Sequence, residues 1–158
     1  MFHERVALML GPRLSFRLLR LWWWIWRPVL AGVRVLIIDD GQVMLVRHTY
    51  RRGWFLPGGI LARGETVEDG ARREAREETG LELHVLELLG VYTSLARNLT
   101  DHVMVFIARP GPTVGEPDHE IAEARWFPAD NLPPGVDPSV PRRLAEFRRG
   151  ARGLVDRW

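Results

Sequence analysis

The sequence predicts an α/β fold in which a mixed β-sheet lies between helices, with a further amphipathic helix at the N-terminus. Two features of the chain lead to this fold class. Apolar, β-branched runs at 32–39 and 42–47 flank the turn signal Asp40-Gly41, which is typical of a β-hairpin. Further along, a helical pattern at 67–79 separates strand-like segments, and another helix follows the last of them. Strands around one central helix, closed by a terminal helix, are typical of an α/β/α sandwich.

The composition is that of one soluble globular domain. The chain has 158 residues, of which 46% are hydrophobic and 27% charged, so it is long enough for a sizeable core but short for two domains. It contains no cysteine, which excludes disulfides, zinc-thiolate sites and thiol catalysis and is compatible with a cytoplasmic location. The formal net charge is only +2 and the basic residues are spread along the chain, so no strong nucleic-acid surface is expected.

Residues 1–31 have the pattern of a basic, tryptophan-rich amphipathic helix with a wide apolar face. Trp24 shares one narrow sector of the helical wheel with four arginines, which are Arg13, Arg17, Arg20 and Arg27. These arginines interrupt the apolar run, so we expect neither a signal peptide nor a spanning helix, and Pro28 ends the segment. Two interpretations are open for residues 13–27: peripheral contact with an anionic membrane, or packing on the protein's own sheet or on the partner subunit of a homodimer.

The predicted hairpin leads into a basic loop at 48–53 and a short strand at 54–59 that ends in a Pro-Gly-Gly turn. Arg51 and Arg52 lie in this loop, and Arg47 directly precedes it. These three side chains are candidates for binding the outer phosphates of a substrate, because the guanidinium fork suits phosphate oxygens. Basic loop residues that bind nothing are the alternative.

A helix is predicted at 67–79, because Thr66 is a favourable N-cap and Gly80 a favourable end. The face of this helix that carries its small and apolar residues also carries three carboxylates, Glu74, Glu77 and Glu78. A buried, unpaired anion is unfavourable. A bound cation would resolve this conflict.

The three glutamates stand at i, i+3 and i+4, so their oxygens can converge on one point. Ligation by oxygen alone suits Mg²⁺ or Mn²⁺ better than zinc. Arg73 reaches Glu77 at i+4 and could fix its orientation. A solvated face of salt bridges is the alternative, but the interleaved small and apolar residues disfavour it.

The chain after the central helix predicts three more strands. These strands are 82–93, 102–109 and 122–127. The first of them has a possible break near Gly90. The intervening segments 94–101 and 110–117 are expected to be loops, the second because of its prolines and glycines.

A proline-rich stretch then leads to a final helix at 142–150. Three side chains of this helix are expected to face inward, namely Leu144, Ala145 and Phe147. The remaining residues, 151–158, are expected to form a frayed C-terminal tail.

The stretch around the central helix resembles the signature of the Nudix hydrolases, which reads Gx5Ex7REUxEExGU with U an aliphatic residue. The matching positions are Gly59, Glu65, Arg73, Glu74, Ala75, Glu77, Glu78, Gly80 and Leu81. Ala75 is smaller than the aliphatic residue usual at its position. The resemblance implies a Nudix-type sandwich over residues 32–150. It also implies hydrolysis of a nucleoside diphosphate linked to another group, which yields a nucleoside monophosphate.

The resemblance also implies roles for individual residues. Glu77 and Glu78 would be the principal metal ligands and Gly59 a carbonyl ligand, while Glu74 would be either a ligand or the general base. Glu65 and Arg73 would support the site. Some members of the family draw a catalytic carboxylate from a loop before a late strand, a position that Glu120 occupies here.

Three functional hypotheses follow from the sequence. The first is a Mg²⁺-dependent hydrolase acting on a nucleotide sugar, an ADP-ribose-like compound or a nucleoside triphosphate. The second is a module with the same fold that senses a nucleotide and cleaves it weakly. The third is a diphosphate hydrolase held at a membrane by residues 13–27.

Overall fold

The computed structural model describes residues 29–96 and 99–158. They form one six-stranded sheet with the order β5-β2-β1-β4-β3-β6. The strands are β1 (Val29–Asp39), β2 (Gln42–His48), β3 (Leu81–Ala96), β4 (Leu99–Thr113), β5 (Ile121–Pro128) and β6 (Leu154–Arg157). The sheet is mixed, because β1 pairs with β4 and β3 with β6 in parallel while the other neighbours are antiparallel.

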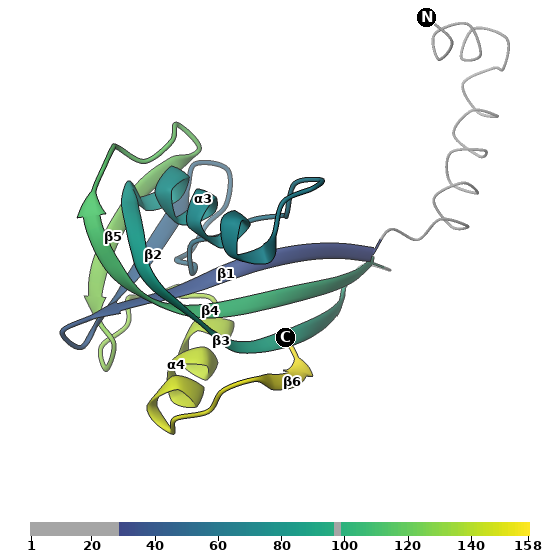
Figure 1. Ribbon diagram of the computed structural model, residues 1–158. Helices are drawn as coiled ribbons and strands as arrows, with labels where there is room; N and C mark the ends of the chain where they lie inside the picture. The colour runs from purple at the N-terminus through teal and green to yellow at the C-terminus, as the bar shows by residue number, and fades with distance from the viewer. Residues whose placement is uncertain (1–28, 97–98) are drawn as a thin grey trace, which may run out of the picture.

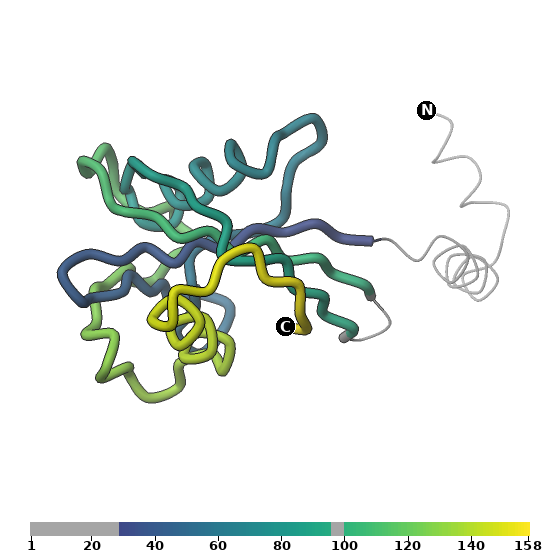
Figure 2. The backbone as a smooth tube through the Cα atoms, turned by 60° about the horizontal axis from the view of Figure 1, so that its bottom comes forward, coloured from purple at the N-terminus to yellow at the C-terminus, as the bar shows by residue number. Residues whose placement is uncertain are grey.

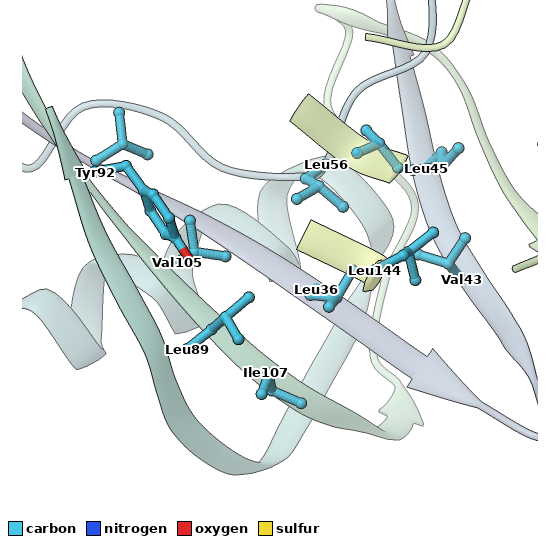
Figure 3. Packing of buried hydrophobic residues seen from close by; sticks show 11 residues of the cluster. Leu36, Val43, Leu45, Leu56, Leu89, Tyr92, Val105, Ile107 and Leu144 are labelled. Carbon is cyan, nitrogen blue, oxygen red and sulfur yellow. The ribbon is translucent and has the colours of Figure 1, made fainter. Parts of the chain in front are cut away.

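Two helices cover the sheet, and Figure 1 shows α3 (Val67–Thr79) on one face and α4 (Ser139–Arg148) on the other. The core has two corresponding clusters. Ala71 and Ala75 of α3 belong to one cluster, together with odd-numbered residues of β1 such as Val35. Leu144 of α4 belongs to the other, together with Leu36 of β1 (Figure 3). The predicted α/β/α sandwich with a mixed sheet is therefore confirmed.

The strands β1 and β2 diverge soon after their turn, because they pair only at Ile38 with Val43 and at Asp39 with Gln42. The segment 54–61 fills the space between them. On one side it bonds to β2, where the Phe55 and Val46 backbones exchange hydrogen bonds of 2.9 Å. On the other side it bonds to β1 at three points, through Val35 N to Pro57 O, Val33 N to Gly59 O and Leu61 N to Ala31 O. The expected strand at 54–59 is thus a set of isolated bridges, which hold the glycine turn against the middle of β1.

Several boundaries differ from those expected. β1 already begins at Val29, so the last residues of the segment expected to be helical are strand. The rest of the proposed N-terminal helix lies outside the described residues, and no described helix is long and apolar enough to cross a membrane. The expected loop at 94–101 is largely strand, because β3 and β4 continue to Ala96 and from Leu99. The predicted break near Gly90 is confirmed by a shift in register between Leu88 and Gly90.

The C-terminal residues do not fray, contrary to expectation. They form β6, which pairs in parallel with β3 along the edge of the sheet (Figure 2). Trp158 fixes the end of this strand, because its backbone N–H donates to Thr93 O at 3.1 Å and its ring packs edge-on against Tyr92 at 6.0 Å. These contacts join residues far apart in the sequence, so local patterns do not reveal them.

The last helix is rotated relative to the prediction and begins earlier. It starts at Ser139, with Pro141 in the first turn, where the missing proline N–H has no helical partner to lose. Ala145 is exposed, so its expected inward orientation is wrong. Arg143 and Glu146 are buried instead. Arg143 donates to Glu146 at 2.7 Å, and Glu146 also accepts a hydrogen bond from the Tyr92 hydroxyl on β3.

Candidate active site

The central helix α3 has the predicted bounds, and its caps explain why. The Thr66 side chain accepts a hydrogen bond from Asp69 N at 3.1 Å, and Gly80 ends the helix in the left-handed conformation, with φ of 71°. Gly70, Ala71 and Ala75 are buried on the sheet. The small residues bring the helix backbone close to the sheet, so the glutamates beside them lie at the edge of the core.

Arg73 is the centre of the site, because its guanidinium bonds to three carboxylates. It holds Glu65 through Nε–Oε1 and Nη2–Oε2 contacts of 2.8 and 3.0 Å. Its Nη1 donates to Glu74 Oε1 at 2.8 Å and to Glu77 Oε2 at 2.9 Å. The bonds from Arg73, with one from Ala62 N, lower the pKa of Glu65 to about 2, and the same carboxylates raise the pKa of Arg73. Four of the signature residues thus form one ion-pair network.

Glu78 lies apart from this network and is nearly buried. Its Oε2 accepts a hydrogen bond of 2.7 Å from Gly58 N, and its Oε1 lies 3.8 Å from His48 Nδ1. Burial raises the pKa of Glu78 to about 7, and the charges of Glu74 and Glu77 act in the same direction. The Gly58 N–H and the charge of Arg34 oppose this shift. Glu78 is therefore a desolvated carboxylate for which added positive charge would be favourable.

The glycine turn lies directly against these carboxylates. A Cβ on Gly59 would lie 2.5 and 2.6 Å from the two carboxylate oxygens of Glu74, so only glycine leaves room for that side chain. The Gly59 carbonyl accepts one hydrogen bond, from Val33 N at 2.9 Å, and keeps a second lone pair. This oxygen and those of the three glutamates are hard donors, so the donor set fits a cation such as Mg²⁺ or Mn²⁺.

The three glutamates do not converge on one point, contrary to the expectation from their spacing. Within residues 29–96 and 99–158 no three carboxylates or imidazoles are grouped closely enough to hold an ion. The reason is that each carboxylate turns to its nearest donor. Glu74 and Glu77 bond to Arg73, whereas Glu78 bonds to the backbone of Gly58.

Two groups at this site were not identified from the sequence. Arg34, on β1, lies close to the glutamates, because a Cβ on Gly58 would lie 2.9 Å from Arg34 Cα and the Gly58 N–H donates to Glu78. Burial lowers the pKa of Arg34, while the charges of Glu78 and Glu74 act in the opposite direction. A lone arginine in the apolar run of a central strand was the signal that could have revealed it. The second group is His48, whose buried Nδ1 has no hydrogen-bond partner among the described residues.

The predicted phosphate-binding arginines are in three different environments. Arg47 pairs with Glu123 at 3.0 Å, on the strand β5. Arg51 lies 3.9 Å over the Phe55 ring and helps to lower the pKa of His48, a shift caused mainly by burial. Arg52 is exposed, and no hydrogen bond or ion pair to the described residues is seen for it. Of the three, Arg51 is the one next to the site.

Glu120, the candidate base from the late loop, lies beside the end of β2. Its carbonyl accepts a hydrogen bond from Thr49 N at 2.9 Å, and its charge raises the pKa of His48 against the effect of burial. His48 in turn lies next to Glu78. The fold therefore brings the loop to the glutamates. A separate hollow of about 390 Å³, lined by Asp39, Arg109 and other residues, lies at the C-terminal end of β1 and includes none of the glutamates of α3.

The fold and this site belong to a known class of enzymes. The sequence model of the NUDIX domain matches residues 28–147. The chain is 32% identical over 117 residues to a "MutT-like protein" from Streptomyces ambofaciens, a match that covers 74% of this chain and 75% of the relative. It is 36% identical over 108 residues to an "ADP-ribose pyrophosphatase" from Methanocaldococcus jannaschii, with coverage of 65% and 64%.

Solved structures agree with this assignment. A MutT NUDIX hydrolase from Burkholderia pseudomallei superposes with a TM-score of 0.67 at 25% identity, over 75% of this chain and 98% of that one. A UDP-X diphosphatase superposes with a TM-score of 0.71 at 25% identity, over 98% and 74%. The chain belongs to the Nudix hydrolase family. It is thus an enzyme of the class that hydrolyses phosphoric anhydrides.

Proposed function

We propose that this protein is a Mg²⁺-dependent hydrolase that cleaves the pyrophosphate bond of a nucleoside diphosphate linked to another moiety. Nucleotide sugars, ADP-ribose-like compounds and nucleoside triphosphates are the substrate classes, and Mn²⁺ is an alternative metal. The observation that carries the proposal is the division of the carboxylates. Arg73 donates hydrogen bonds to Glu65, Glu74 and Glu77. The nearly buried Glu78, beside them, accepts its hydrogen bond from the Gly58 N–H instead.

In this proposal Glu77, Glu78 and the Gly59 carbonyl hold the metal, and Arg73 and Glu65 orient them. Glu74 is either a further ligand or the general base, and Glu120 is the alternative base. When bound, the metal supplies positive charge to the phosphate oxygens and makes water a better nucleophile. The chain itself supplies Arg51 for the outer phosphates, with Arg47 and Arg52 as further candidates.

The names of the relatives support the reaction and leave the nucleotide open. They include an ADP-ribose pyrophosphatase, a putative 8-oxo-dGTP diphosphatase from Bacillus subtilis and a UDP-X diphosphatase. The names differ in base and in leaving group, but all denote cleavage of a phosphoric anhydride in a nucleotide. We therefore propose that this chain cleaves the same kind of bond, and we assign no base.

A panel of nucleotides with Mg²⁺ tests the proposal. ADP-ribose, a nucleotide sugar and a dinucleoside polyphosphate resist alkaline phosphatase until they are cleaved, so released phosphate reports their hydrolysis. Pyrophosphate release reports the hydrolysis of 8-oxo-dGTP. We expect Glu78→Gln to reduce turnover of the best substrate at least about 100-fold, because it removes a proposed metal ligand. The matched control is Glu68→Gln, in the exposed first turn of the same helix.

Two results would contradict the proposal: turnover by the wild type in excess EDTA, and full activity of Glu78→Gln with an unchanged circular dichroism spectrum. A third result would favour the sensing module. In that case nucleotides raise the melting temperature of the protein, yet no member of the panel is hydrolysed.

We also propose that residues 13–27 hold the enzyme at an anionic membrane. Val29 and Leu95 support this proposal, because their side chains are 64% and 68% exposed and both pair with Thr100 at the end of the sheet where residue 28 joins β1. An apolar edge next to a basic amphipathic segment suits a lipid surface. We expect co-sedimentation with vesicles that contain phosphatidylserine, and its loss on deletion of residues 1–27. If the deletion instead changes only the oligomeric state, the segment is a homodimer contact.

A further inference from the structure

Arg34 is a charged side chain in the middle of an otherwise apolar strand. Its Nη1 donates to the carbonyl of Val33 at 3.1 Å, and among residues 29–96 and 99–158 no carboxylate lies within ion-pair distance of it. An arginine has five N–H donors and stays charged in proteins. Most donors of this partly buried guanidinium are therefore available to a ligand.

Arg34 lies beside the site, because Gly58, which packs against its Cα, donates to Glu78 Oε2 at 2.7 Å. Burial lowers the pKa of Arg34, while Glu78, Glu74 and Asp101 raise it. Two of the predicted phosphate-binding arginines differ in this respect, because Arg47 has Glu123 as a direct partner and Arg51 has Asp137 at 3.7 Å. Arg34 is thus close to the carboxylates of the site, yet within the described residues it forms an ion pair with none of them.

The glycine turn packs closely against β1 around Arg34. Gly32 is two residues earlier, and its backbone is not in the left-handed region, so its lack of a side chain matters for room. A Cβ there would lie 3.1 Å from the Gly59 carbonyl oxygen and 3.8 Å from Asp101 Oδ1. Gly58 is packed even more closely, because a Cβ on it would lie 2.9 Å from Arg34 Cα. The small residues thus hold Arg34 beside the turn that carries the Gly59 carbonyl.

We propose that Arg34 binds the diphosphate group of the substrate beside the glycine turn that carries the Gly59 carbonyl. This inference rests on the proposed function, since it assigns a substrate contact within the same site. The guanidinium donates to the non-bridging phosphate oxygens. A planar fork suits two oxygens of one phosphate, so lysine is not an equivalent replacement.

The test compares Arg34→Gln and Arg34→Lys with the wild type. The matched control is Arg109→Gln, an exposed arginine on the neighbouring strand β4 that is not part of the site. The probe is methylenediphosphonate, a diphosphate that cannot be hydrolysed and carries no nucleoside. Its inhibition constant is measured with Mg²⁺ against the best nucleotide substrate, together with KM, kcat, melting temperature and the affinity for Mn²⁺.

For Arg34→Gln we expect KM and the inhibition constant to rise together, about 10- to 100-fold, because charge-assisted hydrogen bonds to the diphosphate are lost. The affinity for Mn²⁺ should change less than about 3-fold, because Arg34 binds no metal ligand directly. Arg34→Lys keeps the charge and should show a smaller rise in both constants. It also gives the answer if Arg34→Gln does not fold.

Different results would contradict the proposed function and the role of Arg34. If the wild type hydrolyses no nucleotide and does not bind methylenediphosphonate with Mg²⁺, the proposed function fails. If the wild type is active but both Arg34 variants keep the wild-type KM and inhibition constant, the role of Arg34 alone fails. A lower melting temperature with unchanged constants would show that Arg34 is only structural, and would likewise overturn the inference.

Discussion

Arg73 and Glu65 form a two-pronged ion pair, with Nε–Oε1 and Nη2–Oε2 distances of 2.8 and 3.0 Å. This pair fixes the plane of the guanidinium. Its third nitrogen, Nη1, is thereby directed at Glu74 and Glu77. Glu65 therefore acts on the helix carboxylates through Arg73, although it precedes the helix and touches neither of them in this network.

The first prediction concerns this network. We expect Arg73→Gln to lower kcat/KM about 10- to 100-fold, because Glu74 and Glu77 lose the donor that orients them. Arg76→Gln on the same helix is the control, since Arg76 pairs with Glu82 outside the network. Steady-state kinetics with the best substrate of the panel measures both variants. Equal kinetics for the two variants would show that Arg73 does not orient the site.

The second prediction concerns Glu78 and pH. Burial raises the pKa of this carboxyl from 4.5 to about 7 in the folded protein, so its contribution to stability is greatest below about pH 4.5 and is lost as the pH rises towards 7. A divalent cation binds the deprotonated carboxylate and restores the lost stability. We therefore expect Mg²⁺ to raise the melting temperature more at pH 8 than at pH 6.

Thermal melts in Mg²⁺ and in EDTA at both pH values measure this difference. Glu78→Gln should abolish the dependence of the Mg²⁺ effect on pH, whereas Glu68→Gln should retain it. The same rise in melting temperature at pH 6 and pH 8 in the wild type would contradict the assignment of Glu78 as a ligand.

The parts of the structure that the sequence predicted are those governed by neighbours in the chain. The ends of α3 follow from Thr66 and Gly80, which act within one turn. The site was predicted only in part for the same reason. Spacing on a helix identified Glu74 as a site residue, but spacing cannot show that its carboxylate turns to Arg73. Nor can it show that Arg34, on a strand far from the helix in sequence, lies at the same site.

The C-terminal region shows the same limit. The strand β6 is short, partly charged and largely exposed, so the pattern of its residues gives no strand signal. Their pairing with β3 and the contact of Trp158 with Tyr92 are made across the fold. The predicted orientation of α4 was wrong for a related reason. Glu146 is buried because the Tyr92 hydroxyl donates a hydrogen bond to it, and an apolar pattern cannot reveal this bond.

The third prediction concerns this buried cluster. The Tyr92 hydroxyl donates to Glu146 Oε2 at 2.7 Å, Arg143 donates to Glu146 Oε1 at 2.7 Å, and the Arg143 guanidinium lies 3.6 Å from the Tyr92 ring centre. Burial, together with the bond to Glu146, raises the pKa of Tyr92. We expect Tyr92→Phe to lower the free energy of unfolding by about 1–3 kcal/mol, because one buried carboxylate oxygen loses its donor.

Urea unfolding measures this loss. Tyr50→Phe is the stability control, since the Tyr50 side chain is 70% exposed. The kcat of Tyr92→Phe should stay near that of the wild type, because the cluster lies on the α4 face, away from the glutamates. An unchanged free energy of unfolding would mean that the hydroxyl contributes nothing to stability.

The last prediction separates the two glycines of the turn. An alanine at Gly58 would overlap the carbonyl of Val33 and would have to adopt a φ of 137°, so we expect Gly58→Ala to unfold at a clearly lower temperature. An alanine at Gly59 would instead meet the end of the flexible Glu74 side chain at 2.5 Å, which can move aside at little cost. Gly59→Ala should therefore keep its melting temperature and lose activity about 10-fold or more, because Glu74 is displaced. The control is Gly115→Ala, where nothing lies within 4 Å of the added Cβ. If Gly59→Ala matches Gly115→Ala in kcat/KM, then the position of Glu74 beside the Gly59 carbonyl has no part in the reaction.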